Sequence, residues 1–217
     1  MSLNTATLLV IIGITASLVL RTAGTIFPAM FANICIVGFV SAVLLCTSLA
    51  MVNFLYAFSA QYIRRKQKIL RTACSFALIG TAASVFLDLR SIFIVLKQPI
   101  LPNILMTHGL DAALPLFSST TLLIFFISFS REMAPMERER LGRAVRSAIN
   151  GSSIFAIVHA VVLINYLSSS RFRWLSSYIQ EAALWMMPIL IIAVLLIVHF
   201  FFSFYRFLHV FPQERGL

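Results

Sequence analysis

Long apolar runs alternate with short charged segments along the whole chain. A helix needs about 20 mostly apolar residues to cross a hydrocarbon layer of about 30 Å. Six segments have this length and carry no charge in their central parts: residues 4–26, 30–58, 72–89, 110–129, 148–167 and 179–204. Because lipid offers the backbone no hydrogen bonds, such segments must form helices or a closed barrel. Continuous runs such as 189–198 lack the alternation of barrel strands, so the pattern predicts an all-α polytopic transmembrane bundle of about six spans.

Composition agrees with lipid as the main solvent. Of the 217 residues, 60% are hydrophobic and 11% are charged, whereas soluble domains average roughly 45–50% apolar and about 25% charged residues. The segments between the apolar runs are too short to fold as soluble domains. We therefore expect one integral membrane domain over residues 1–217.

The distribution of Lys and Arg predicts the orientation, since cytoplasmic loops carry the excess of positive charge. Twelve cations fall on one side: Arg64, Arg65, Lys66, Lys68, Arg71, Arg131, Arg138, Arg140, Arg143, Arg146, Arg206 and Arg215. Five fall on the other: Arg21, Arg90, Lys97, Arg171 and Arg173. The asymmetry predicts an N-in/C-in topology, and we expect the bacterial cytoplasmic (inner) membrane as the location.

The net charge of +10 would suggest nucleic acid as a partner if it were spread evenly. The cations instead lie in short clusters between apolar runs, with almost no aromatic residues among them, which is typical of loops at an anionic membrane surface. We expect anionic lipids at the cytoplasmic face and no nucleic acid. The run 137–143 is predicted to be a solvated helical extension with mixed charges. The alternative is that this run forms a docking surface for a soluble partner.

Two parts of the pattern are open to more than one interpretation. Residues 90–107 either lie along the outer interface, which we favour, or continue the third helix to Lys97 and bury Asp88 and Arg90 near its outer end. Residues 125–131 resemble residues 200–206, with a weaker copy at 57–59. This echo, with Arg-x-Ala at 71–73 and 146–148, is compatible with three stacked hairpins of 71–75 residues. Chance matching is easy in a Phe-rich chain, and we favour chance.

Small residues at every fourth position mark two helices for close packing, because such residues let helix backbones approach each other in lipid. They are Ala73, Ala77 and Thr81 in the third span, and Ser152, Ala156 and Ala160 in the fifth. We expect these two helices to lie at the centre of the bundle. Pro115 and Pro188 are expected to bend the fourth and sixth helices.

His159 is the first candidate for chemistry, because ionisable residues at membrane depth usually face the protein interior and often mark function. The favoured interpretation is a neutral histidine hydrogen-bonded to a neighbouring helix, for instance to Asn53 or to a backbone carbonyl. A proton-relay or ligand role is the alternative.

A second candidate group lies on the outer side. Asp88, Asp111 and Glu181, with Arg90 and His108, are a possible pocket for a cation or a polar ligand. Asp111 and Glu181 also stand near helix N-termini, where acidic side chains complement the helix dipole. We favour this second, structural interpretation.

Four histidines raise the question of haem b held by two imidazoles. The best pair, His108 and His159, differs in height by about six residues, or about 9 Å at 1.5 Å per residue. We therefore expect no cofactor and no metal site, with haem b as a minor alternative.

The familiar catalytic motifs are missing from the sequence: it has no Walker loop, no nucleophile elbow, no zinc-protease motif and no dinucleotide-binding fingerprint. Our leading hypothesis is a non-catalytic membrane subunit, a signal-input or anchoring module that works with other membrane chains. The alternative is a small transporter or channel with a polar path near Asn53, Asn150 and His159. An enclosed polar cavity reaching Asn150 and His159 would favour the alternative.

Overall fold

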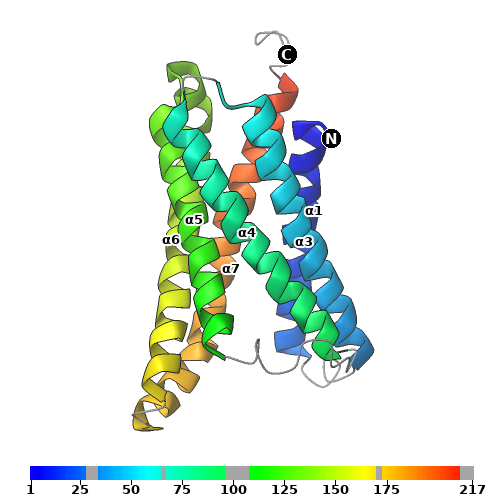
Figure 1. Ribbon diagram of the computed structural model, residues 1–217, viewed down its shortest axis with the longest axis vertical. Helices are drawn as coiled ribbons and strands as arrows, with labels where there is room; N and C mark the ends of the chain where they lie inside the picture. The colour runs from blue at the N-terminus through cyan, green and yellow to red at the C-terminus, as the bar shows by residue number, and fades with distance from the viewer. Residues whose placement is uncertain (28–33, 65–66, 96–107, 170–172, 211–217) are drawn as a thin grey trace.

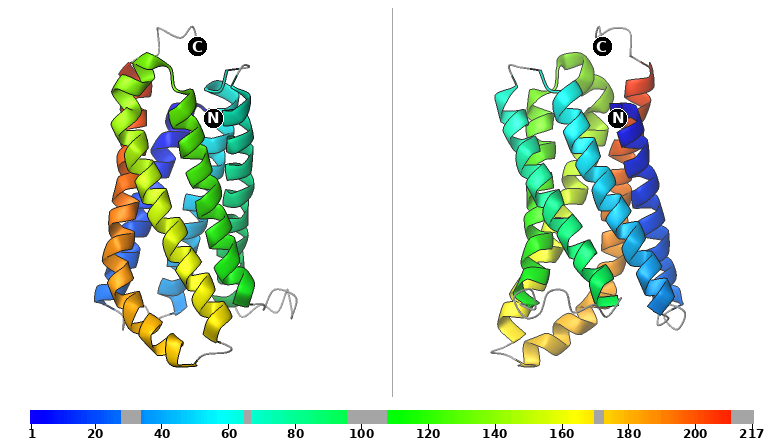
Figure 2. Two further views of the ribbon diagram at one scale, coloured as in Figure 1. Left: turned by 90° about the vertical axis from the view of Figure 1, so that its left-hand side faces the viewer. Right: turned by 45° about the vertical axis from the view of Figure 1, so that its right-hand side comes forward.

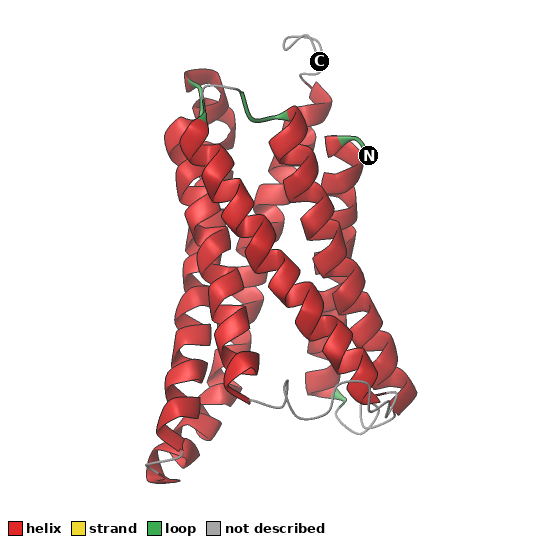
Figure 3. Ribbon diagram, in the orientation of Figure 1, coloured by secondary structure: helices red, strands yellow, loops and turns green. Residues whose placement is uncertain are grey.

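The computed structural model describes residues 1–27, 34–64, 67–95, 108–169 and 173–210 (Figure 1). These residues form six α-helices and no strand (Figure 3). The helices are α1 (Leu3–Ile26), α3 (Ile34–Gln61), α4 (Lys68–Val95), α5 (His108–Glu132), α6 (Pro135–Ser169) and α7 (Arg173–Val210). All six are long and apolar enough to cross a membrane. The prediction of an all-helical fold with six helices able to span a membrane is confirmed for the described residues, and it indicates an integral membrane protein.

Several helices extend further than the apolar runs, and α6 and α4 bear on the expectations from the sequence. α6 begins at Pro135, so the charged run 137–143 is helical as expected. Pro suits the first turn of a helix, and the Ala134 N–H at its start donates to Glu137 Oε2 at 3.1 Å. α4 continues through Arg90 to Val95, and the Ser91 hydroxyl donates to the Leu87 carbonyl in the ordinary helical pattern.

The favoured interpretation of residues 90–107 as an interfacial segment is therefore wrong for residues 90–95. The apolar residues that follow Arg90 include no helix breaker before Pro99, so the helix simply continues. Residues 96–107 lie outside the described part of the chain. Pro115 and Pro188 both fall inside helices, α5 and α7, and Figure 2 shows that α7 inclines in its N-terminal part.

The helices are arranged as a closed ring. Among the described residues, each helix contacts its neighbours in the chain order, and α7 returns to contact α1 (Figure 2). α1 begins and α7 ends at the same end of the ring, which we call the terminal end (Figure 1). α3 and α5 also end there, and α4 and α6 begin there.

No described helix occupies the centre of this ring, so the expectation that α4 and α6 are central is wrong. Their small residues pack against neighbours within the ring instead. A Cβ added to Gly80 of α4 would lie 3.1 Å from Ser118 Cα of α5, and one added to Gly151 of α6 would lie 2.6 Å from the Ala193 carbonyl oxygen of α7. Close approach of backbones is needed at these two pairwise crossings.

The ring consists of three hairpins with equivalent contacts: α1–α3, α4–α5 and α6–α7. The first helix of each carries a Leu, an Ala and a Gly at the same spacing, 67 and then 71 residues apart. The Leu and Ala positions are buried in every hairpin. They are Leu3, Ala6 and Gly13; Leu70, Ala73 and Gly80; and Leu141, Ala144 and Gly151.

The second helices of the hairpins repeat in the same way. The glycine of each hairpin packs closely against one residue of the second helix, which is Thr47, Ser118 or Ala193. A buried phenylalanine follows seven residues later in each case, at Phe54, Phe125 and Phe200. In this structural register, residues 71–73 correspond to residues 142–144. The Arg-x-Ala match in the sequence had paired residues 71–73 with residues 146–148, which lie one helical turn later. The recurrence of buried contact positions favours true repetition over chance similarity.

Candidate functional site: a pocket on the axis of the ring

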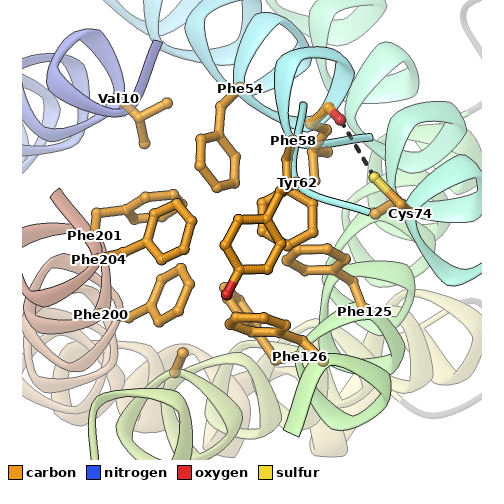
Figure 4. Close-up of a cluster of buried hydrophobic side chains, with 14 of the residues drawn as sticks. Val10, Phe54, Phe58, Tyr62, Cys74, Phe125, Phe126, Phe200, Phe201 and Phe204 are labelled. Carbon is orange, nitrogen blue, oxygen red and sulfur yellow. Dashed lines mark hydrogen bonds between the residues drawn. The ribbon is translucent and has the colours of Figure 1, made fainter. Parts of the chain in front are cut away.

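A cluster of aromatic rings fills the axis of the ring in its terminal half. The rings come from alternate helices, α3 with the turn that follows it, α5 and α7, and point toward one another (Figure 4). They belong to Phe54, Phe58, Tyr62, Phe125, Phe126, Phe129, Phe200, Phe201 and Phe204, which we call the Phe cluster. All nine are buried.

Rings from different helices meet edge to face across the axis. The centroid distances are 5.0 Å for Phe54 with Phe201, 5.2 Å for Phe58 with Phe125 and 4.9 Å for Phe126 with Phe200. Edge-to-face pairs at these distances are favourable beyond the area that they bury. The Phe cluster therefore links three helices that do not touch each other along the wall of the ring, and it closes the axis at this end.

A pocket of about 380 Å³ lies on the other side of the Phe cluster and takes side chains from all six helices. Met51, Leu122 and Ile197, at equivalent positions of the three hairpins, form its floor and pack against or within the aromatic core. Nine lining side chains carry polar groups: Ser17, Thr47, Ser48, Ser84, Asp88, Ser118, Ser119, Ser152 and His159. The volume is within the range of about 300–1,000 Å³ that small-molecule sites occupy.

Two hydrogen bonds join neighbouring hairpins at equivalent positions. Ser48 Oγ of α3 donates to Asp88 Oδ2 of α4 at 2.6 Å, and His159 Nδ1 of α6 lies 3.2 Å from Ser119 Oγ of α5. Both pairs are 40 residues apart in the chain. Val194 of α7 stands where the other hairpins have Ser48 and Ser119, so its side chain makes no such bond to α1.

Two further hydroxyl pairs join the helices within the first two hairpins. Ser17 Oγ and Thr47 Oγ1 are 2.9 Å apart, and Ser84 Oγ donates to Ser118 Oγ at 2.9 Å. The third hairpin has Phe155 and Ala193 at these positions. The pocket consequently has a hydroxyl-rich wall from the first two hairpins and a more apolar wall from α7.

Ser152 differs from the other hydroxyls of the pocket. It is 1% exposed, and its Oγ has no hydrogen-bond partner among the residues that the structure describes. Thr81, at the equivalent position of the second hairpin, donates to the Ala77 carbonyl at 2.8 Å, and the first hairpin has Ile14 there. An unpaired buried hydroxyl is costly and uncommon in folded proteins.

The structure brings together some of the residues predicted from the sequence. Asp88 and His159 both line the pocket. Asn53 and Asn150 are exposed and do not line it, so the predicted polar path includes His159 but neither asparagine. A neighbouring helix does supply a hydrogen-bond partner for His159, as expected. The partner described is Ser119 of α5, which was not named with Asn53 or a backbone carbonyl as an expected partner.

Other candidate residues are exposed or fall outside the described part. Arg64, Lys68, Arg138, Arg140 and Arg143 are exposed near the terminal end. The side chains of His108, Asp111, Glu181, Arg65 and Lys66 lie outside the described residues, so the grouping of outer carboxylates and the His108–His159 haem pair are not compared with the structure. Among the described residues, no group of three or more His, Cys, Asp or Glu is placed to hold a metal.

The hydroxyls of the pocket were missed by sequence reasoning. Ser and Thr are ordinary residues of membrane helices, and neither spacing nor motif distinguishes Ser48 or Ser119 from the rest. The signal that identifies them is the repeat in its structural register, which places both serines at equivalent positions facing the axis.

Comparison of the chain with known protein families, with curated proteins and with solved structures finds no match.

Proposed function

We propose that this chain is a small-solute transporter that binds its substrate in the axial pocket. The observation that carries this proposal is the pocket itself, which holds nine polar side chains in a largely apolar lining, takes side chains from all six described helices and adjoins the Phe cluster at one end. A site shared by every helix of a ring changes shape when any hairpin tilts. Binding energy is thereby coupled to the movement of helices.

The transport cycle would require the Phe cluster to separate while the opposite end of the pocket narrows. The cluster is suited to this because its contacts are many and individually weak, about 0.5–1.5 kcal/mol for an aromatic pair beyond area burial. The three hairpins offer three similar bodies that can tilt about the axis. Substrate sites between repeated units are a common arrangement in transporters.

We propose the N-in/C-in orientation in a bacterial inner membrane, with the terminal end in the cytoplasm. The exposed cations near this end support it, since cytoplasmic segments are enriched in Lys and Arg. The pocket would then face outward in the described conformation. Anionic lipid headgroups would lie against the basic surface.

The second candidate is a non-catalytic subunit or signal-input module of a larger membrane assembly. One observation favours it: the N-terminal part of α6 presents Arg138, Arg140 and Arg143 at the surface. A partner chain docked there would receive a conformational signal from the pocket, because α6 also carries Ser152 and His159.

Cysteine accessibility separates the two candidates. In a variant with Cys35→Ala, Cys46→Ala and Cys74→Val, a single Ser84→Cys change places a thiol on the pocket wall. Val is chosen because Val145 occupies the position equivalent to Cys74. In vesicles of known orientation, a transporter exposes this thiol to an impermeant thiosulfonate reagent from each side in turn.

A signal-input module would react from one side only, and that result would overturn the transporter proposal. Ile157→Cys is the matched control, because Ile157 is exposed on the outer surface of the ring and its thiol would lie in lipid. It should react from neither side.

A further inference from the structure

We propose that the pocket takes a small amphipathic molecule with an uncharged hydrogen-bonding head, such as a hydroxyl, a carbonyl or an amide. This inference rests on the proposed solute-binding function of the pocket. The head group contacts the hydroxyl wall and Ser152, and the apolar body lies against Phe155, Val194 and Ile197.

The repeat is kept at the positions that pack the hairpins together and is broken at positions that line the pocket. The Leu, Ala, Gly and Phe positions that hold the hairpins together recur three times, and the Leu, Ala and Phe positions are buried each time. Three other positions carry hydroxyls that line the pocket in the first two hairpins: Ser17 and Ser84, Thr47 and Ser118, and Ser48 and Ser119. The third hairpin replaces them with Phe155, Ala193 and Val194.

This break is not required for packing, because the ring closes with hydroxyls at two interfaces and with apolar side chains at the third. A pocket lined identically by three hairpins would suit a symmetric occupant. One polar wall facing one apolar wall suits a molecule with a polar and an apolar side, in keeping with the way sites orient ligands by a few placed polar groups.

The polar groups of the lining favour a head group without net charge. Asp88 already accepts a hydrogen bond from Ser48 at 2.6 Å, and His159 is hydrogen-bonded to Ser119. The other polar groups of the lining are hydroxyls, which both donate and accept. A net charge brought into an apolar environment needs a dedicated counter-charge, whereas an uncharged head is satisfied by hydroxyls alone.

The Ser152 hydroxyl is buried in the lining and has no hydrogen-bond partner within the described part of the chain. It lies one helical turn from Phe155 and next to Gly151, at the depth where the pocket meets the aromatic core. A hydrogen bond from a ligand would satisfy this oxygen. Ser152 is therefore the residue whose chemistry most directly reports an occupant.

The test uses 3-azioctanol, an eight-carbon alcohol that carries a photoreactive diazirine, with the full chain in lipid nanodiscs. Labelled residues are identified by mass spectrometry. We expect saturable labelling of pocket residues on α6 and α7, and competition by 1-octanol. Ser152→Ala should weaken this labelling at least fivefold and raise the melting temperature, because it removes an unpaired buried hydroxyl.

Ser153→Ala is the matched control, since the neighbouring Ser153 hydroxyl donates to the Ile149 carbonyl at 2.8 Å and does not line the pocket. It should leave labelling unchanged. Labelling that does not saturate and spreads over exposed residues such as Ile157 and Phe202 would overturn the proposal. So would equal labelling of Ser152→Ala, or stronger competition by octylammonium or octanoate than by 1-octanol.

The outcome is distinguishable from failure of the transporter proposal. Saturable pocket labelling together with one-sided reactivity of Ser84→Cys would support the proposed ligand class and contradict transport. Reaction of Ser84→Cys from both sides without pocket labelling would support transport and contradict the proposed ligand class.

Discussion

His159 is an ionisable side chain at membrane depth, and its ring is held on two sides. It stacks on Phe155 with centroids 5.9 Å apart, and its Nδ1 lies 3.2 Å from Ser119 Oγ. The single proton of the Ser119 hydroxyl points to the carbonyls of Pro115 and Leu116, at 2.9 and 3.0 Å. Ser119 Oγ therefore accepts, His159 Nδ1 donates, and the acceptor of the neutral ring is Nε2.

Replacing His159 should measure this bond. We expect His159→Leu to lower the free energy of unfolding in mild detergent by about 0.6–2 kcal/mol, the range of hydrogen bonds between membrane helices. Ser119→Ala should lower the free energy of unfolding by less in the His159→Leu background than in the native chain. Thermal or denaturant unfolding of the two single variants and the double variant gives the coupling, and strictly additive effects would show that the bond is not formed.

At the scale of the elements, the glycine of each hairpin sets how closely its two helices approach. A Cβ added to Gly13 would lie 3.1 Å from Thr47 Cα, and the same distance separates an added Cβ at Gly80 from Ser118 Cα. The neighbouring atoms are backbone, which cannot rotate away. Because the pocket lies beside these crossings, a change in helix spacing is transmitted to its walls.

Gly80→Ala should therefore be destabilising although Ala is the better helix former. The added carbon would overlap Thr121 Oγ1 and crowd Ser118 Cα, and overpacking typically costs about 1–3 kcal/mol. Gly142→Ala is the matched control in α6, where the nearest atom, Arg138 Cγ, is 3.8 Å away. It should be neutral or stabilising by up to about 1 kcal/mol, as helix propensity predicts. Equal melting temperatures of the two variants would contradict the close crossing.

At the scale of the whole molecule, the ring encloses the pocket instead of a central helix. Closure depends on the contact of α7 with α1, the first and last helices of the chain. The Phe cluster fills the axis on the terminal side, and the lining hydroxyls follow it toward the opposite end. Along the axis from the terminal end, the Phe cluster comes first, then the floor of the pocket, and then the part of the pocket that the hydroxyls line.

The orientation can be tested by single-cysteine labelling in intact cells. Phe27 is exposed at the end of α1 and Lys68 is exposed at the start of α4, on opposite ends of the ring (Figure 1). In the cysteine-less variant, Phe27→Cys should react with an impermeant maleimide added outside, and Lys68→Cys should react only after the cells are opened. The reverse pattern would invert the topology.

The basic surface near the terminal end gives a further prediction. Reversing Arg138, Arg140 and Arg143 to Glu should weaken the binding of anionic lipid to the detergent-solubilised protein, by about 1 kcal/mol for each positive charge removed. The helix should remain intact, because all three side chains are exposed. If lipid binding is unchanged while a co-purifying membrane chain is lost, the surface belongs to a protein partner and the signal-input candidate gains support.

The sequence by itself determined the properties that depend on local hydropathy. Six helices, an integral membrane location and the helical run 137–143 follow from the length and charge of each segment, because a backbone in lipid must satisfy itself within the segment. Part of the repeat was also visible in residues 125–131 and 200–206. Its register was not, since Arg71 and Arg146 match by letter but occupy different turns of their hairpins.

Only the tertiary structure decided which face of each helix turns toward the axis. In lipid, the outer face of a helix is as apolar as its packed face, so hydropathy does not distinguish them. Asn53 and Asn150 consequently looked like pocket residues and are exposed, while Ser48 and Ser119 looked ordinary and line the pocket. Their roles arise from bonds between residues 40 positions apart, which form only when glycine crossings and the Phe cluster set the rotation of every helix.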